Sequence, residues 1–448
     1  MAASVFESQL YGDLFPSGDA GRLFTDSAEV RAMLLVEGSL AKVQGTAGVI
    51  PEESATAISR AVMEVQVDPS ALRKATGQNG VPVPALVAAF REEMNAPEHA
   101  QYVHWGATSQ DIMDTALMLR LRQALMLIEA DLQAAVKSLA KLAETHAKLP
   151  MPARTYGQHA TPTSFGAVAA SWGAPLLTLL EELPELRKTC LLVSLSGAAG
   201  TAGALGDKAT DLRAELAKAL SLGDPGRSWH VDRAPILRIT NWMERVNIAL
   251  GKLGTDTIAL VQTGIGEITL GGAGSSSTMP QKQNPVAPSA LVALAHQATA
   301  LKSVLNNAAM HQHQRDGAAW FSEWLCLPQI VLGTASAARI AKDLSTTLAP
   351  NAATMLAALD NGLDLIHAEA LSFALTAKLP RPEAQATVKS LCQEVTASNT
   401  PLRELVARDH PDLDAASLFD AAQQLGQAPS EAQSFASDVA NYLRDQKD

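Results

Sequence analysis

The segment Gly271–Pro285 combines small residues with side chains that can bind an anion and move a proton. It reads GGAGSSSTMPQKQNP, and its first residues allow backbone conformations that are closed to larger residues. Lys282 and Asn284 follow, so hydroxyls, backbone N–H groups, one ammonium group and one amide lie in one short stretch. Such groups can hold a carboxylate and stabilise the charge that develops when a proton moves beside it. We therefore predict a catalytic loop at residues 271–285.

Two other kinds of loop contain glycine and serine in this way. A flexible linker has a similar composition, but this segment is short, lies within a helical region and continues into residues that are not typical of linkers. A nucleotide-phosphate loop has the pattern GxxxxGK[ST], which is absent because Lys282 lies between Gln281 and Gln283. The short length, the helical context and the residues that follow favour a catalytic loop over a linker, and the spacing excludes the phosphate loop.

Polar residues also gather just before the longest predicted helix, in the sequence HWGATSQD of His104–Asp111. Thr108, Ser109 and Asp111 are residue types that cap helix N-termini, and a helix N-terminus favours a bound anion. Capping alone is an adequate explanation for Asp111. It does not account for His104 or for two hydroxyl residues before the cap, so this segment is a candidate for substrate binding.

A third polar segment, RTYGQHATPTS, covers Arg154–Ser164 and leads into another predicted helix. It carries one cation, Arg154, one imidazole, His159, and several hydroxyl groups. Taken alone, His159 is more often a structural histidine than a catalyst. Beside the other two polar segments, it becomes a third candidate.

Helical periodicity dominates the chain, and strand-like alternation is scarce. The stretch Asp111–Lys148 contains neither Gly nor Pro, and its apolar residues recur at spacings of three and four. At about 1.5 Å per residue, this helix would approach roughly 55 Å in length. Further long helices are predicted at Ile236–Leu250 and Ser289–Asp316.

These patterns predict an all-α fold with a central bundle of long helices. We expect three helical domains: an N-terminal domain at 1–110, the long-helix bundle with the signature loop at 111–345, and a C-terminal domain at 346–448. In the first domain, Asp26 with Glu29 three residues later predicts a capping box at a helix start. The central apolar stripes exceed what one short bundle needs, which favours assembly with other subunits, although one chain could also bury them.

Composition limits the classes of partner and compartment. The chain of 448 residues has a net charge of −11, and 47% of its residues are hydrophobic. This acidity argues against nucleic acid or an anionic membrane as the main partner. Three widely spaced cysteines, Cys190, Cys326 and Cys392, fit a reducing compartment and no zinc site. The N-terminus lacks a signal-peptide pattern, and no membrane-spanning stretch stands out, so we predict a cytoplasmic protein.

The three polar segments, in this order and spacing, resemble the active-site motifs of the fumarase/aspartase superfamily. That superfamily includes adenylosuccinate lyase, argininosuccinate lyase and the bacterial 3-carboxy-cis,cis-muconate cycloisomerases. Its signature GSSxMPxKxNP is matched by Gly274–Pro285 with one additional serine, and counting back from Lys282 and Asn284 places the catalytic serine at Ser276. The resemblance covers nearly the whole chain. It implies an all-α homotetramer whose active sites each draw their three motifs from three subunits, with no cofactor and no metal.

The superfamily reaction removes a proton from the carbon α to a carboxylate and expels a group from the β carbon, or runs in reverse. The resemblance implies that Ser276 transfers the proton and that Lys282 helps to stabilise the dianionic intermediate. His104 and His159 are the next candidates for the proton transfer. The residues expected to bind a small polycarboxylate substrate are Thr108, Ser109, Arg154, Tyr156, Gln158, Ser277, Met279, Asn284 and Arg315.

Arg315 lies in the sequence HQHQRD, and the resemblance places it near the substrate carboxylates. A planar guanidinium suits that role because it can bind a carboxylate through two hydrogen bonds. The alternative is an ion pair with Asp316 or Glu323. His311 and His313 are two residues apart, so they do not share a helix face and we reject them as a metal-binding pair.

Tyr156 distinguishes among members of the superfamily. Fumarase, adenylosuccinate lyase and argininosuccinate lyase carry a histidine in the pattern RTHxQ, whereas this chain has RTYGQ. A phenol with a pKa of about 10 cannot replace an imidazole that titrates near about 6.5 as a proton donor to an amine. A carboxylate leaving group needs little protonation. In reverse, attack of a tethered carboxylate on a double bond is a lactonisation.

The N-terminal sequence SVFESQLYGDLF and the HWG form of the second motif also look most like the cycloisomerase branch. The expected activity is therefore conversion of 3-carboxy-cis,cis-muconate to 4-carboxymuconolactone in protocatechuate catabolism. The alternative is a C–N lyase of the same superfamily, similar to adenylosuccinate lyase or aspartase. An inactive helical scaffold is disfavoured because Ser276, Lys282 and Asn284 are intact.

Overall fold

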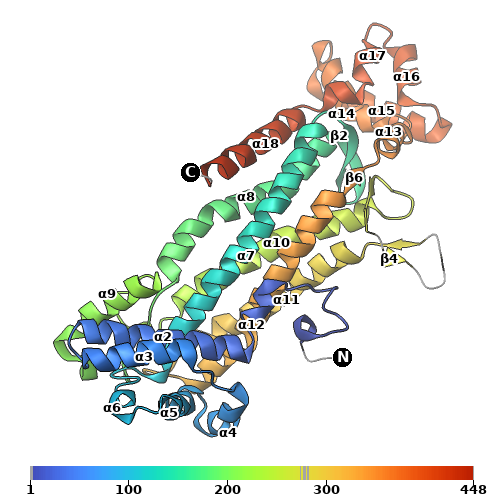
Figure 1. The fold of residues 1–448 in the computed structure, drawn as a ribbon. Helices are drawn as coiled ribbons and strands as arrows, with labels where there is room; N and C mark the ends of the chain where they lie inside the picture. The colour runs from blue at the N-terminus through green and yellow to red at the C-terminus, as the bar shows by residue number, and fades with distance from the viewer. Residues whose placement is uncertain (1–3, 273, 276–278, 280–281, 447–448) are drawn as a thin grey trace. The chain divides into compact units, whose positions relative to one another are not determined.

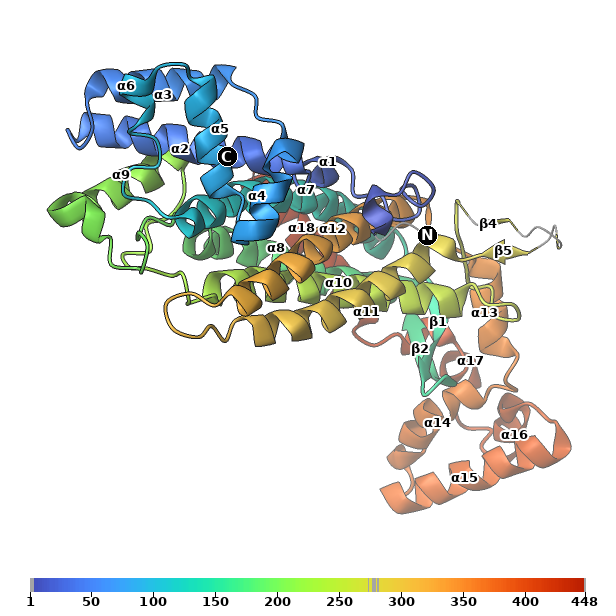
Figure 2. The same ribbon diagram turned by 90° about the horizontal axis from the view of Figure 1, so that it is seen from below.

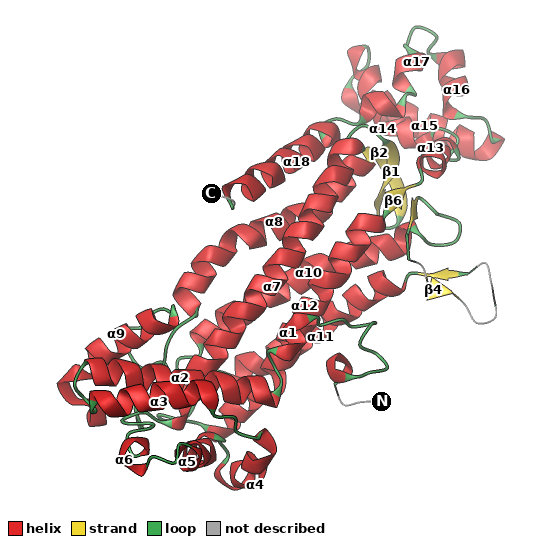
Figure 3. Cartoon of the chain, viewed as in Figure 1, coloured by secondary structure: helices red, strands yellow, loops and turns green. Residues whose placement is uncertain are grey.

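The computed structural model describes residues 4–272, 274–275, 279 and 282–446. Helices make up most of this part of the chain, and its strands are short (Figure 3). The predicted all-α fold is confirmed. The chain forms two compact units, one of residues 1–131, 179–248 and 293–340 and the other of residues 132–178, 249–292 and 341–448. The three-domain division with boundaries near residues 110 and 345 remains a prediction.

Five long helices contribute residues to both units: α7 (Ser109–Thr145), α8 (Phe165–Cys190), α10 (Ala234–Leu260), α11 (Val286–Ala308) and α12 (Gly317–Thr347). Indole groups tie neighbouring helices together inside each unit. In the first unit, Trp242 of α10 donates a hydrogen bond to the Leu179 carbonyl of α8 at 2.8 Å. In the second unit, Trp172 of α8 donates to the Asp256 carboxylate of α10 at 2.8 Å. These contacts join helices of the predicted bundle.

The junction between α11 and α12 differs from the expected structure. The uninterrupted pattern over Ser289–Asp316 predicts one helix, but α11 ends at Ala308 and α12 begins at Gly317. Between them, His313 adopts a left-handed backbone conformation with a φ of 52°. The Asp316 carboxylate accepts a hydrogen bond from the Ala319 N–H at 3.2 Å, as a capping residue does. The prediction of one helix is wrong because the second helix is started by its own cap, and the residues between Ala308 and Gly317 include no Gly or Pro that would indicate the break.

Helix α2 (Asp26–Thr46) lies beside α3 (Glu52–Glu64) in both ribbon views (Figures 1 and 2). Its N-cap is Thr25, whose hydroxyl accepts from the Ala28 N–H at 3.3 Å, so the predicted cap at Asp26 is one residue too late. Gly45 permits the close approach of the two helices, because a Cβ there would lie 2.3 Å from the Cβ of Ala55. This packing makes α2 a rigid support within the first unit.

A β-hairpin precedes α8, and its strands were not expected from the sequence pattern. Strand β1 (Pro150–Thr155) pairs antiparallel with β2 (Gln158–Ser164). The two residues between them, Tyr156 and Gly157, have φ values of 52° and 76°, which is typical of the tight turns that join hairpin strands. The prolines within the hairpin and the lack of polar–apolar alternation hide it from a periodicity argument.

The remaining elements are shorter. In the first unit they are η1 (Val5–Glu7), α1 (Asp19–Arg22), α4 (Pro69–Asn79), α5 (Val83–Glu93), α6 (Pro97–Ala100), η2 (Gly203–Lys208) and α9 (Ala209–Leu220). In the second unit, β3 (Ile268–Thr269) pairs with β6 (Ala349–Pro350), and β4 (Gly274–Ser275) pairs with β5 (Gln283–Asn284). The C-terminal elements are α13 (Ala352–Asp360), η3 (Leu365–His367), α14 (Ala368–Ala374), η4 (Leu375–Ala377), α15 (Arg381–Ser398), α16 (Leu402–Asp409), α17 (Ala415–Leu418), η5 (Ala421–Gln424) and α18 (Ala428–Asp445).

Helix α12 is the one described helix whose length and apolar composition would allow it to cross a membrane. Within the protein, 72% of that apolar stretch is buried. A buried helix at the centre of a large core has the same composition.

Candidate active site

The start of α7 is fixed by Asp111. Its Oδ2 accepts a hydrogen bond from the Thr108 N–H at 3.0 Å, which satisfies a backbone group that the helix itself leaves free. Unlike an ordinary surface cap, the Asp111 side chain is fully buried. Asp111 therefore anchors the helix start inside the protein and is not itself available to a substrate.

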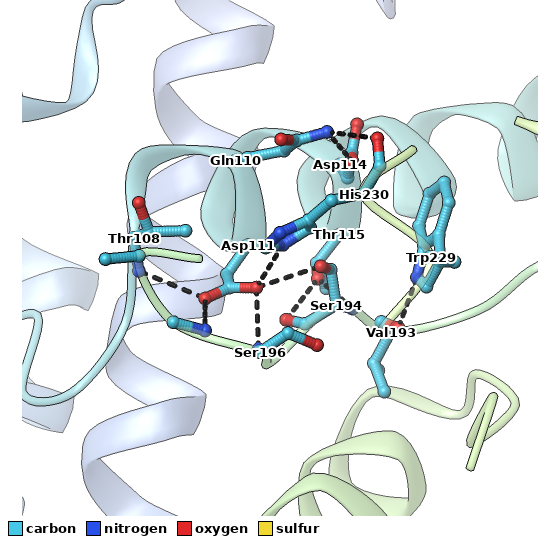
Figure 4. Close-up of polar contacts among 12 residues, drawn as sticks. Thr108, Gln110, Asp111, Asp114, Thr115, Val193, Ser194, Ser196, Trp229 and His230 are labelled. Carbon is cyan, nitrogen blue, oxygen red and sulfur yellow. Dashed lines mark hydrogen bonds and ion pairs between the residues drawn. The ribbon is translucent and has the colours of Figure 1, made fainter. Parts of the chain in front are cut away.

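Asp111 also joins α7 to two distant segments (Figure 4). Its oxygens accept hydrogen bonds from Ser194 Oγ at 2.9 Å, Ser196 N–H at 2.8 Å, Gly197 N–H at 2.9 Å and His230 Nε2 at 2.8 Å. Burial raises the pKa of Asp111, but the hydrogen bond and charge of His230 and the two backbone N–H groups outweigh it, so the pKa lies below its ordinary value. A buried, ionised carboxylate thus holds the site's framework.

His230 belongs to the site's framework although the sequence pattern does not indicate it. Its Nε2 donates to Asp111, and its backbone carbonyl accepts from Gln110 Nε2 at 2.9 Å. Among the described residues, its buried Nδ1 has no hydrogen-bond partner. The neighbouring Trp229 donates its indole N–H to the Val193 carbonyl at 2.8 Å. In the sequence, Trp229 and His230 form only a short aromatic and polar cluster between helices, and no periodicity indicates a role for it.

Gln110 aims Arg315 toward the start of α7. Gln110 Nε2 donates to Asp114 at 3.2 Å and to the His230 carbonyl, so its Oε1 remains to accept from Arg315 Nε at 2.9 Å. The same guanidinium reaches Thr108 Oγ1 at 3.5 Å and the Ala198 carbonyl at 3.3 Å. All of these acceptors are neutral, so the charge of Arg315 is left for an anion.

The two ion pairs considered for Arg315 are not formed in the structure. Glu323 instead pairs with Arg233 at 2.7 Å, and Arg233 also contacts Asp114 at 2.8 Å in a buried cluster. Asp316 accepts hydrogen bonds from the backbone N–H groups of Gln312 and Ala319. The salt-bridge alternative is therefore disfavoured.

His104 lies close to the same helix start and is held from α2. Its Nδ1 is 2.7 Å from Oε1 of Glu37, whose side chain is 1% exposed. Burial lowers the pKa of His104, but the hydrogen bond and charge of Glu37 raise it more, so the pKa lies above its ordinary value. The first unit thus gathers four of the predicted residues, His104, Thr108, Ser109 and Arg315, around the start of α7.

In the second unit, the β1–β2 hairpin carries the third polar segment. Arg154 donates to the buried Glu267 carboxylate through two hydrogen bonds of 2.8 and 2.5 Å. This guanidinium is therefore already paired, and its expected contact with substrate stays a prediction. Tyr156 at the turn is fully exposed, and Gln158 beside it is exposed. His159 is the register partner of Arg154; burial and the charge of Arg154 lower the pKa of His159.

The signature loop is described only in part. Ser276 and Ser277 lie outside the described residues, so their predicted roles remain predictions.

Lys282 and Met279 are exposed, and Asn284 lies in β5 opposite Gly274. Gly274 packs closely against the start of α11, because a Cβ there would lie 2.7 Å from Cγ2 of Val286, whose side chain would have to move. Among the described residues, no group of three or more His, Cys, Asp or Glu side chains could hold a metal ion.

The fold and these motifs define an all-α lyase of the fumarase/aspartase type. Residues 20–299 match the protein family described as Lyase, and the chain belongs to that family. The 3-carboxy-cis,cis-muconate cycloisomerase of Pseudomonas aeruginosa is 36% identical over 432 residues, which cover 94% of each chain. The nitrosuccinate lyase of Streptomyces davaonensis is 35% identical over 446 residues, which cover 95% of this chain and 94% of that protein.

Solved structures show the same relationship. The 3-carboxy-cis,cis-muconate lactonizing enzyme from Pseudomonas putida superimposes with a TM-score of 0.91 at 34% identity, covering 97% of this chain and all (100%) of that chain. The fold expected from the three motifs is thus the fold of the chain.

Proposed function

We propose that the chain is a 3-carboxy-cis,cis-muconate cycloisomerase that forms 4-carboxymuconolactone. The observation that carries this proposal is Tyr156 at the turn of the hairpin, where adenylosuccinate lyase and argininosuccinate lyase carry an imidazole. Similarity to cycloisomerases at 34–36% identity over most of the chain supports the same activity. The direct test is loss of the diene absorbance of 3-carboxy-cis,cis-muconate on addition of the purified protein.

In the proposed reaction, a carboxylate oxygen of the substrate forms a bond with the carbon β to another carboxylate of the same molecule. The π electrons move onto that second carboxylate and give a dianionic intermediate, which Lys282, Asn284 and the Thr108–Ser109 hydroxyls stabilise. Ser276 then delivers one proton to the α carbon and recovers it from solvent. The nucleophile is already ionised and tethered, so proximity supplies much of the acceleration.

Arg315 anchors a substrate carboxylate in this scheme, because its hydrogen-bond acceptors among the described residues are neutral and Gln110 fixes its orientation. We predict that Arg315→Gln raises KM by about 10- to 100-fold, the loss expected for one charged hydrogen-bonded contact of about 1.5–3 kcal/mol. Steady-state kinetics check this. Arg227→Gln, which removes an exposed guanidinium paired with Asp232, is the matched control and leaves KM unchanged. An unchanged KM in Arg315→Gln would remove Arg315 from the site.

We further propose a cytoplasmic homotetramer that acts in aromatic catabolism and whose active sites are shared between subunits. Tyr156 supports sharing, because its fully exposed side chain at the hairpin tip is accessible to another subunit. Large exposed apolar side chains on the long helices, such as Met126, Ile248 and Leu325, offer surface for such an assembly.

Tyr156→Ala separates stability from activity. The exposed ring makes few contacts in its own chain, so the free energy of unfolding should change by less than about 0.5 kcal/mol. Turnover of 3-carboxy-cis,cis-muconate should nevertheless fall at least about tenfold, since one substrate contact is lost. Co-expression with Ser276→Ala subunits should restore part of the activity, because mixed assemblies contain some intact sites. No recovery in mixed assemblies would contradict shared sites.

Nitrosuccinate elimination is the second candidate, favoured by the 35% identity to a nitrosuccinate lyase. Nitrite, like a carboxylate, leaves as a stable anion at neutral pH, so Tyr156 is compatible with it. Adenylosuccinate and argininosuccinate are disfavoured because their amine leaving groups need the proton that the missing histidine supplies.

A further inference from the structure

Glu37 is a buried carboxylate in the middle of α2 whose partner among the described residues is a single imidazole. Its Oε1 lies 2.7 Å from Nδ1 of His104, and its Oε2 has no hydrogen-bond partner there. An ionised carboxylate buried in this way is costly unless a cation compensates it. The surroundings of Glu37 therefore favour a proton on both nitrogens of His104.

The backbone around His104 fixes this contact. His104 has a left-handed φ of 65°, an uncommon conformation for a residue with a side chain. The neighbouring Trp105 carbonyl accepts from Gln44 Nε2 at 2.7 Å, and the Val103 carbonyl accepts from Arg91 at 2.8 Å. These bonds hold the segment against α2 and α5, so the ring is placed with its Nδ1 edge on Glu37.

Three charged groups face the His104 ring from the packed helices. Glu37 of α2 and Asp111 of α7 favour the imidazolium, and Arg91 of α5 opposes it. Asp111 already accepts five hydrogen bonds, whereas Glu37 has, in the described part of the chain, His104 alone. Glu37 is therefore the group that decides the charge on the ring.

We propose that Glu37 is a positioning residue that keeps His104 charged, with Nε2–H left to bind a carboxylate of the substrate. This rests on the proposed polycarboxylate substrate. Because His104 lies four residues before Thr108, the bound carboxylate also meets the N-terminus of α7. A stabilised imidazolium is a weaker acid than free imidazolium, so His104 serves as a cationic anchor and leaves the proton transfer to another group, such as Ser276.

Glu37→Gln tests the proposal, since the amide keeps the shape and an acceptor but removes the charge. Exchange of the histidine C2 hydrogen with deuterium, followed by mass spectrometry at a series of pH values, reports the pKa of His104 in the intact protein. We expect that pKa to fall by about one unit or more. At about pH 7.5, KM for 3-carboxy-cis,cis-muconate should rise about tenfold while kcat changes less than about twofold.

Two further variants keep the test specific. Glu53→Gln changes an exposed carboxylate on α3 and leaves the pKa of His104 and KM as they are. In His104→Gln, KM rises as in Glu37→Gln, and adding Glu37→Gln to it has little additional effect, because both changes remove the same contact.

An unchanged pKa of His104 in Glu37→Gln would overturn the role of Glu37. If Glu37→Gln lowers the pKa of His104 but leaves KM unchanged, or reduces only kcat, the anchoring role of His104 would be overturned. If the wild-type protein does not turn over 3-carboxy-cis,cis-muconate, the proposed function fails, while the exchange measurement still decides whether Glu37 holds the charge on His104.

Discussion

Replacing Ser276 with alanine is expected to lower kcat for 3-carboxy-cis,cis-muconate by about 10²- to 10⁴-fold, the usual contribution of a positioned proton-transfer group. The substrate would still bind, because Arg315, Lys282 and Asn284 remain, so KM should change far less than kcat. The quaternary structure on size-exclusion chromatography should be that of the wild type.

Ser277→Ala is the matched control for this prediction, because the loop contains one more serine than the signature of the superfamily. It removes a neighbouring hydroxyl from the same loop and should reduce kcat by less than about tenfold, as for a single binding contact. A large loss in Ser277→Ala with near-normal activity in Ser276→Ala would shift the catalytic position by one residue. Near-normal activity in both would move the proton transfer to another group, with His159 as the next candidate.

Asp111→Asn is expected to lower the free energy of unfolding by about 3–5 kcal/mol, the cost of breaking a buried ion pair and its hydrogen bonds. The Asp111 carboxylate accepts five hydrogen bonds, and an amide can accept only at its oxygen. Urea unfolding at fixed protein concentration measures the change. Asp19→Asn, which breaks an exposed pair with Arg22, is the control and should cost less than about 1 kcal/mol.

The same carboxylate predicts a pH dependence. The pKa of Asp111 in the folded protein lies below its ordinary value of 3.8, so its stabilising contribution is present above about pH 3.8 and is lost as the pH falls through the folded pKa. Asp111→Asn should lack this part of the acid destabilisation. An equal loss of stability in acid for wild type and variant would contradict an ionised Asp111.

The helical fold could be predicted from the sequence because apolar residues recur at helical spacing along stretches such as Asp111–Lys148, which becomes α7. The β1–β2 hairpin could not, because Pro150, Pro152 and Pro162 obscure any alternation. The break before α12 was also hidden, since it depends on capping by Asp316 and a left-handed His313. Both features escape a prediction from periodicity because they depend on local backbone geometry and capping, which the apolar spacing does not record.

Candidate site residues could be predicted where they lie together in one sequence motif, as Thr108 and Ser109 do. Its supporting residues were not, because they meet the motifs only after folding. Glu37 is 67 residues from His104, Glu267 is 113 from Arg154, and His230 is 119 from Asp111. Such pairs are set by tertiary packing, and a single sequence does not contain a spacing that reveals them.

Parallel turnover of alternative substrates tests the central claim most directly. The purified protein would be offered 3-carboxy-cis,cis-muconate, nitrosuccinate, adenylosuccinate, argininosuccinate and aspartate under the same conditions, with lactone, nitrite, amine and fumarate measured as products. The proposed function predicts loss of the diene absorbance and formation of a lactone with the first substrate, at a kcat/KM well above that for any other. Release of nitrite, ammonia or an amine without lactone formation would contradict it.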